Sequence, residues 1–460
     1  MIFLLDPRIH HHAISQQAAA ASPMNGYPLA LKETLESLIS KMAESLELFV
    51  ETPGIDFTRD RKLPFEDVVQ LLISMGGNSI YKELLEAYGF NVNTATTSAF
   101  VQQRAKILPS AFEFLLHEFT ESHPSLETYR GYRLLANDGS DLLIATNPDD
   151  PETFCQNNPG EKGYNLIHLN AMYDLCNRLY ADAIIQPNIC KNESKALVDM
   201  VGRSRISGDV IVIGDRGYES YNNFAHIERK GWHYLIRVKD LCSSGILSGL
   251  DLPSTDEFDV IINRVLTRKQ TNEVKSNPHI YRYLNSKSTF DFLDLRTNLF
   301  YPISFRVVRL KITDDTYETL ITNLPQSEFT PQELKILYKM RWGIETSFRE
   351  LKYAVGLTNF HAKKRGYIEQ EVFARVIMYN FAEMITTHVI ISQSDTAYMY
   401  QVNFTVAIFI CKRLLRLVDN DPPPDAEALI RKNILPVRPE RSFVRNIRSK
   451  TAVSFLYRVA

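Results

Sequence analysis

The pattern of hydrophobic positions changes from helical to strand-like along the chain. The first part has apolar residues at helical spacing, and Pro64 and Pro109 stand where helices are expected to start. The stretches with this spacing are 31–50, 65–74, 78–88, 96–106 and 109–118. This pattern predicts a helical unit at the N-terminus.

From Tyr132 onward the pattern predicts strands that alternate with helices. The expected strands are 132–136, 166–173, 179–186, 210–213 and 232–238, with a helix over 193–203 and another between the last two strands. The run 210–213 is continuously apolar, which is typical of a buried central strand. The order of elements indicates an α/β sheet with a mixed, partly antiparallel edge.

The second half of the chain begins with irregular strand-like segments and ends in helices. Segments 261–268, 280–284 and 303–312 predict a β-rich insertion over 240–316, followed by a strand over 317–322. Pro331 starts a long helix expected to reach about Val355, and two further apolar helices are expected over 368–391 and 402–417.

Composition places the chain among ordinary globular proteins. It has 460 residues, of which 45% are hydrophobic and 23% are charged, so bulk disorder is not expected. Its five cysteines form no C-x-x-C pair, which favours reduced thiols in a cytoplasmic protein. No apolar run reaches the roughly 18 residues of a membrane span, and the N-terminus lacks a signal-peptide pattern. We therefore expect a cytoplasmic protein with no membrane partner.

Charge is divided unevenly along the chain. The net charge is −2, but the last 30 residues contain eight basic residues and one acidic residue, or +7, which leaves −9 for the rest. The basic residues are Arg431, Lys432, Arg438, Arg441, Arg445, Arg448, Lys450 and Arg458. Such a tail is a candidate phosphate-contacting arm, although a solvated tail without a partner has the same composition.

The helix expected from Pro331 places four polar side chains on one face. Tyr338, Arg341, Glu345 and Lys352 stand at offsets 0, 3, 7 and 14 and, at about 100° per residue, fall within about 60° of one another. Ordinary pairing between Arg341 and Glu345, four residues apart, would explain part of this stripe without any function.

Two aspartates follow predicted strands. Asp138 lies in Asn-Asp-Gly-Ser after the strand 132–136, and Asp215 lies in Gly-Asp-Arg-Gly after the strand 210–213. Both segments also have turn chemistry. Ligand sites in α/β sheets lie beyond the carboxyl ends of strands. With a helix-borne Glu345, the two aspartates would form an all-oxygen site suited to Mg²⁺ or Mn²⁺ and unsuited to Zn²⁺.

The spacing Tyr338-x2-Arg341-x3-Glu345-x6-Lys352, with the two Asp segments in order before it, resembles the YREK signature of insertion-sequence DDE transposases. The resemblance covers about residues 60–460. It implies an RNase H-like α/β core and cut-and-paste DNA transposition, with a DNA hairpin at the transposon end in well-studied members. It also implies that Asp138, Asp215 and Glu345 are catalytic and hold two Mg²⁺ ions, for which Mn²⁺ can substitute. Asp141 is the fallback for Asp138.

The resemblance also assigns DNA contacts. Tyr338, Arg341 and Lys352 would contact phosphates near the transposon end, while Trp342 would stack on a displaced base or serve in the core. His168 and Asn170 could approach the site from a central strand, although a structural histidine is the simpler interpretation. Expected partners are double-stranded DNA, as transposon ends and target, and a second copy of the chain in the DNA complex.

These patterns predict a division of the chain and leave two alternatives open. The expected units are a helical DNA-binding unit, the first part of the core, a β-rich insertion, the second part of the core, and a helical C-terminal part with the basic tail. Their ranges are 1–125, 126–239, 240–316, 317–392 and 393–460. The alternatives are an RNase H-like nuclease without strand transfer and a DNA-binding regulator that has lost catalysis.

Overall fold

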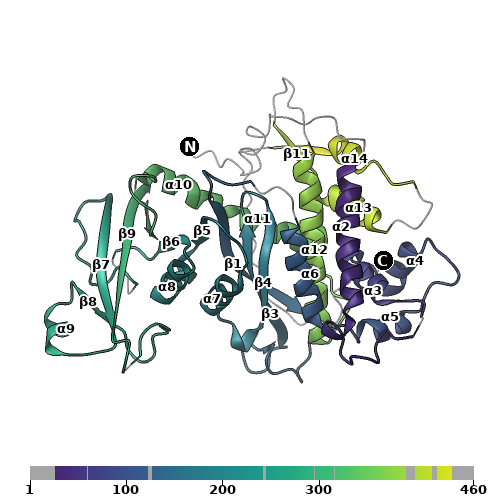
Figure 1. Cartoon of the computed structure of the whole chain (residues 1–460), viewed down its shortest axis with the longest axis horizontal. Coiled ribbons are helices and arrows are strands. Elements are labelled where there is room, and N and C mark those ends of the chain that lie inside the picture. The colour runs from purple at the N-terminus through teal and green to yellow at the C-terminus, as the bar shows by residue number, and fades with distance from the viewer. Residues whose placement is uncertain are drawn as a thin grey trace.

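The N-terminal part of the structure is helical and packs against one long C-terminal helix (Figure 1). The computed structural model describes residues 26–59, 61–122, 127–241, 245–294, 296–314, 316–389, 399–416 and 422–437. The N-terminal helices are α2 (Gly26–Glu44), α3 (Phe65–Ser74), α4 (Ile80–Ala87), α5 (Thr97–Arg104) and α6 (Pro109–Glu121). Helix α12 (Arg365–His388) is buried along nearly its whole length between these helices and the central sheet.

The central sheet contains the strand order β4-β3-β1-β5-β6. These strands are β1 (Arg133–Ile144), β3 (Tyr164–Asp174), β4 (Leu179–Pro187), β5 (Val210–Gly214) and β6 (His233–Val238). Strands β1, β3 and β4 pair antiparallel, whereas β5 and β6 are parallel to β1. A three-strand meander followed by two parallel strands is the arrangement of an RNase H-like core, which confirms the predicted fold class.

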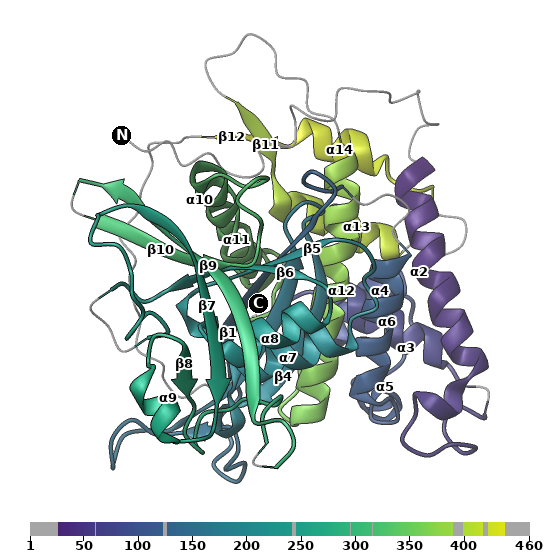
Figure 2. The ribbon, with the colours of Figure 1, turned by 60° about the vertical axis from the view of Figure 1, so that its left-hand side comes forward.

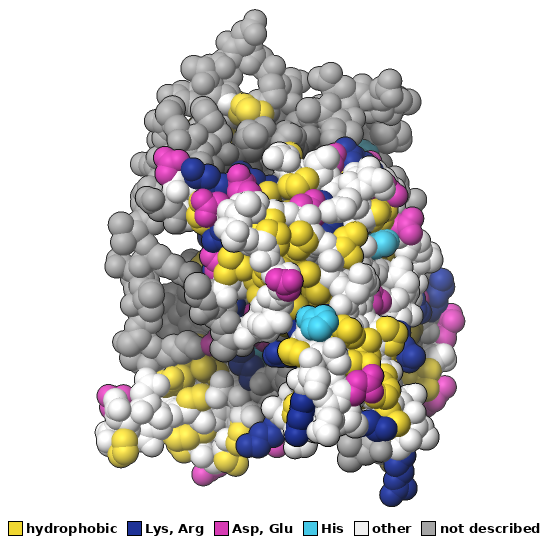
Figure 3. Space-filling view, turned by 90° about the vertical axis from the view of Figure 1, so that its left-hand side faces the viewer, with side chains coloured by type: hydrophobic (Ala, Val, Ile, Leu, Met, Phe, Trp, Pro, Cys, Tyr) yellow, Lys and Arg dark blue, Asp and Glu magenta, His cyan; other side chains and the backbone are white. Residues whose placement is uncertain are grey.

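The β-rich insertion extends the same sheet. Strands β7 (Phe258–Thr267), β8 (Tyr281–Tyr283) and β9 (Phe300–Thr313) continue it beyond β10 (Thr316–Thr322), which pairs with β6. Figure 2 shows β9 and β7 lying beside β10, with α9 (Asn272–Ser276) next to β8. On the described surface of this end, basic and acidic side chains are interspersed with hydrophobic ones (Figure 3).

Two hydrophobic cores lie on opposite faces of the sheet. Leu134 and Ala136 of β1 point into the core shared with α6, α12 and the helix that contains Glu345. Leu135 points into the other core, formed with α7 (Glu193–Arg203) and α8 (Tyr221–Arg229). Because side chains alternate along a strand, Asp138 has the parity of the first face and Gly139 that of the second.

The segment expected as a turn after the first strand is part of that strand. Residues 137–141 continue β1 and pair with β3, with Asp138 opposite Ala171 and Asp141 opposite His168. The expectation that Asp138 follows the strand is therefore wrong. Pairing with a long, buried neighbour provides backbone hydrogen bonds along the whole of β1, which outweighs the turn preference of Asn-Asp-Gly-Ser.

The helix expected from Pro331 to about Val355 is not uniform. It consists of α10 (Pro331–Met340), α11 (Trp342–Glu350) and a π-helical turn over Leu351–Val355, and it ends at Gly356 with φ 100°. Arg341 joins the first two segments. The π turn changes the rotation per residue, so the predicted one-face geometry does not extend unchanged to Lys352.

The rest of the described C-terminal part is helical, with one short antiparallel pair of strands. It comprises β11 (Tyr400–Val402), α13 (Phe404–Leu415), α14 (Ala426–Lys432) and β12 (Ile434–Pro436), and β11 pairs with β12. Among the described residues, no helix is both long and apolar enough to cross a bilayer.

A buried ion pair joins the N-terminal helices to α12. Arg104 and Glu371 are both about 1% exposed, and Arg104 Nη1 donates to Glu371 Oε1 at 2.8 Å. Burial would raise the pKa of Glu371, but Arg104 and His361 outweigh it and lower the pKa to about 2. The pair therefore stays ionised at neutral pH.

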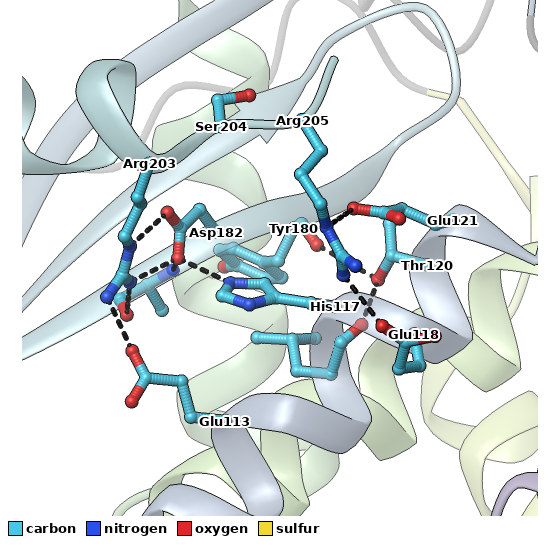
Figure 4. Close-up of polar contacts among 12 residues, drawn as sticks. Glu113, His117, Glu118, Thr120, Glu121, Tyr180, Asp182, Arg203, Ser204 and Arg205 are labelled. Carbon is cyan, nitrogen blue, oxygen red and sulfur yellow. Dashed lines mark hydrogen bonds and ion pairs between the residues drawn. The ribbon is translucent and has the colours of Figure 1, made fainter.

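A second polar cluster joins α6 to the edge of the sheet (Figure 4). Asp182 of β4 accepts from Arg203 Nε at 2.9 Å and lies 2.8 Å from His117 Nε2. Beside it, Arg205 pairs with Glu118 and Glu121 of α6, but its side chain is 56% exposed. The same junction thus contains one shielded and one exposed set of ion pairs.

We predict that Arg104→Met lowers the free energy of unfolding by about 3–5 kcal/mol, because it leaves the Glu371 carboxylate charged and buried without its cation. Arg205→Met is the matched control, and its exposed pairs should cost less than about 1 kcal/mol. Urea unfolding followed by circular dichroism measures both. Equal losses for the two variants would contradict the prediction.

Candidate functional site

Asp138 lies on β1, and Asp215 follows directly after the neighbouring parallel strand β5. The register of β1 and β5 pairs Ala136 with Ile213, and each aspartate comes two residues later in its own strand direction. Each carboxylate accepts from a nearby glycine N–H at 2.8 Å, Asp138 from Gly139 and Asp215 from Gly217. The sheet therefore fixes the two acids side by side where β5 ends.

Glu345 reaches this edge from α11, which packs on the first face of the sheet. Helix α11 contacts β1, and Ile344 is fully buried in the core beneath it. A Cβ atom at Gly343 would lie only 2.9 Å from Leu175 Cδ2, so the absence of a side chain there lets the helix approach closely. This approach brings a third carboxylate toward Asp138.

The charges of Asp215 and Glu345 affect the pKa of Asp138. The pKa of Asp138 is raised to about 6, with burial as the largest cause; the charges of Asp215 and Glu345 also raise it, while the Gly139 N–H and Arg341 lower it. Asp138 therefore takes up a proton at a higher pH than an ordinary aspartate does. The structure therefore brings these three predicted residues into one electrostatic cluster.

Arg341 neutralises part of this cluster. Its side chain is 6% exposed, and its Nη2 donates to Glu345 Oε1 at 2.7 Å. The ordinary four-residue pairing considered from the sequence is thus present. In the described part of the chain, no three Asp, Glu, His or Cys side chains stand in metal-ligand geometry. The donor set nevertheless suits a hard divalent cation, since all its atoms are carboxylate oxygens and they carry unbalanced negative charge.

The remaining residues of the predicted signature occupy different surroundings. Lys352 Nζ donates to the backbone oxygen of Asp141 at 3.1 Å, which ties the π turn to β1. Trp342 is 51% exposed beside Arg341, with the guanidinium carbon 5.5 Å from its ring, so a core role for this tryptophan is wrong. Tyr338 is only 3% exposed, and its hydroxyl has no hydrogen-bond partner among the described residues.

A second group of charged residues lies next to the acids. His168 is 1% exposed; its Nδ1 lies 2.7 Å from Asp141 Oδ1 and its Nε2 lies 3.1 Å from Glu193 Oε1. Lys191 Nζ lies within 3.4 Å of both carboxylates. Asn170 donates to Gln186 and to the Ile184 oxygen, which gives it a structural role in the sheet.

Glu193 and Lys191 were missed by the sequence analysis. Glu193 is the first residue of α7, after the N-cap Asn192, which is an ordinary place for a glutamate at the start of a helix. Nothing in the local sequence pattern marks Glu193, because its position beside the acids depends on how α7 packs against the sheet. Of the basic tail, Arg431 and Lys432 end α14, and the other six basic residues lie outside the described residues.

We predict that Asp138→Asn stabilises the cation-free protein above pH 6. Because the folded-state pKa of Asp138 is raised, its protonated form gives stability at low pH that is lost as pH rises through about 6. Asparagine does not titrate, so the melting temperature of the variant should exceed wild type by about 1–3 °C at pH 8. The difference should shrink toward pH 4, as measured by thermal denaturation in EDTA; a difference independent of pH would contradict it.

Comparison with known proteins identifies a family for this chain. The family described as "Transposase DDE domain" matches residues 129–381, which include both aspartates and Glu345. No curated protein matches the sequence. Among solved structures, the piggyBac transposase synaptic complex with hairpin DNA is similar, with 10% identity and a TM-score of 0.44 over 87% of this chain and 83% of that chain. The family match covers more than half of this chain, so the chain belongs to the transposases with a DDE domain.

Proposed function

We propose that the protein is an insertion-sequence transposase of the YREK-signature family. It binds the terminal inverted repeats of its element and catalyses cleavage and strand transfer by a cut-and-paste route. The observation that supports this proposal best is the placement of Asp138 on β1 beside Asp215 at the end of β5, with the charge of Glu345 on α11 acting on Asp138. Two paired copies, one on each transposon end, are the proposed working assembly.

In this proposal Asp138, Asp215 and Glu345 are the catalytic acids and hold two Mg²⁺ ions, with Mn²⁺ as a substitute. When bound, these cations supply Lewis-acid activation of the attacking and leaving oxygens of the phosphodiester. The three carboxylates orient this chemistry at the edge of the sheet. Cation binding also removes the repulsion among them, because it replaces the protonation that a raised pKa of Asp138 otherwise favours.

Arg341 has two partners in the proposed cycle. In the free protein it pairs with Glu345. A phosphate entering the site would accept two hydrogen bonds from the Arg341 guanidinium. Glu345 would then lose its ion pair with Arg341 and could bind the cation. Lys352 adds a second positive charge from the π turn, and exposed Trp342 offers a ring on which a displaced base can stack. Tyr338 was predicted to contact a phosphate, but it is only 3% exposed and its ring lies 5.7 Å from the Arg341 guanidinium carbon. We therefore propose that Tyr338 supports Arg341 and does not itself contact the DNA.

We predict that Glu345→Gln reduces DNA-end cleavage by at least about a hundredfold while leaving end binding intact, because it removes a charge needed only for the chemistry. Asp199→Asn, which alters an exposed carboxylate on α7, is the control and should cleave as wild type does. The assay uses purified protein, Mg²⁺ and DNA bearing the terminal repeats. Cleavage by the Glu345→Gln variant at the wild-type rate would overturn the role of Glu345.

The same assay separates the alternatives. Pre-cut ends incubated with target DNA should yield joined products, as a transposase requires. Cleavage without joined products would instead favour an RNase H-like nuclease. Specific end binding with no cleavage in either Mg²⁺ or Mn²⁺ would favour a DNA-binding regulator that has lost catalysis.

We predict that Lys352→Met weakens DNA-end binding and makes it less sensitive to salt. Loss of one phosphate contact should reduce the slope of log affinity against log salt concentration by about 1. Cation binding should be nearly unchanged, since Lys352 donates to the backbone oxygen of Asp141 and is not one of the three proposed cation ligands. Fluorescence anisotropy at several salt concentrations measures the slope. A wild-type slope combined with weaker Mn²⁺ binding would contradict this division of roles.

A further inference from the structure

Glu193 approaches the two aspartates from the face of the sheet opposite to Glu345. Gly139 has the strand parity of the second face, where α7 packs, whereas Asp138 has that of the first. A Cβ atom at Gly139 would lie 3.0 Å from Glu193 Oε1 and 2.2 Å from His168 Nε2. Gly139, the residue after Asp138, therefore leaves room for the Glu193 carboxylate next to the backbone of β1.

The other oxygen of Glu193 faces the second aspartate. A Cβ atom at Gly217 would lie 3.2 Å from Glu193 Oε2 and 3.1 Å from Asp215 Oδ1. The carboxylates of Glu193 and Asp215 thus both border the space that a side chain at Gly217 would occupy. Glycines at both positions leave the space that lets a single glutamate reach both aspartate-bearing segments.

The carboxylate of Glu193 has two basic neighbours. His168 Nε2 lies 3.1 Å from Glu193 Oε1, and Lys191 Nζ lies 3.4 Å from the same oxygen. These neighbours lower the pKa of Glu193, with His168 as the largest cause. A negative charge is therefore maintained next to Asp215 at neutral pH.

Three buried side chains at this place have polar atoms without a hydrogen-bond partner among the described residues, and one of these atoms is His168 Nε2. Asn137, which precedes Asp138, is fully buried and both its side-chain atoms are unsatisfied. The Tyr218 hydroxyl is unsatisfied as well, and the charges of Glu193, Asp138 and Asp215 all act on it. Buried polar groups without partners commonly mark the place of an ion or water that completes the arrangement.

We propose that Glu193 is a fourth carboxylate of the catalytic centre, which strengthens divalent-cation binding by Asp138 and Asp215 from the face opposite to Glu345. This inference rests on the proposed function. The resemblance assigns three acids to the site, and Glu193 is additional to them. Glu193 adds negative charge to the cation site, while His168 lies beside it and Lys191 offsets part of its charge.

The test is Mn²⁺ binding to the full chain without DNA, measured by isothermal calorimetry. Glu193→Gln keeps the shape of the side chain and an oxygen that can accept a hydrogen bond, but removes its charge. We expect it to weaken Mn²⁺ binding by about 10–100-fold. Lys191→Met removes a competing cation and should tighten binding by roughly two- to fivefold. Asp199→Asn, an exposed acid on the same helix, should bind as wild type does.

Opposite shifts for Glu193→Gln and Lys191→Met are expected only from an electrostatic role. A purely structural role would lower the melting temperature of both variants and move Mn²⁺ affinity in the same direction. Wild-type affinity in Glu193→Gln would overturn the inference. If Asp138→Asn and Asp215→Asn also left Mn²⁺ binding unchanged, the proposed function would fail together with the inference. Loss of binding in those two variants alone would leave the proposed function standing and reject only the role of Glu193.

Discussion

The constraint on which this structure depends is the gathering of like charges in a partly buried place. Three carboxylates meet at one edge of the sheet, and the pKa of Asp138 rises to about 6 because burial and its acidic neighbours oppose ionisation. In the free protein Arg341 offsets part of this cost through its ion pair with Glu345. The fold therefore holds in place an arrangement that becomes favourable only when positive charge arrives.

Close backbone approach is what makes the gathering possible. Gly343 lets α11 lie against the sheet, while Gly139 and Gly217 leave room for the Glu193 carboxylate. A side chain at Gly139 or Gly217 would crowd the Glu193 carboxylate, and one at Gly343 would crowd Leu175 of the core. The two faces of the sheet thus contribute acids to one edge, and the parity of β1 decides which face each residue serves.

Rigid surroundings keep these positions fixed. Helix α12 lies between the sheet and the N-terminal helices, and buried Arg104 and Glu371 join α5 to it. On the other side, Asp182 connects β4 with α6 and with the end of α7, the helix that begins with Glu193. A catalytic group displaced by about 1 Å can lose much of its effect, so such ties matter to the site as well as to stability.

The sequence by itself determined the fold class, because hydrophobic periodicity is a local property. The three acids now proposed as catalytic were predicted from residue spacing together with the resemblance to a transposase signature. The sequence also predicted the β-rich insertion. Only the tertiary structure decided that residues 137–141 continue β1, that the signature helix is broken at Arg341, and that Tyr338 is buried while Trp342 is exposed. Glu193 left no signal in the sequence, since a glutamate at the start of a helix is ordinary. Its place between two glycines arises from packing between elements far apart in the chain, which no local pattern encodes.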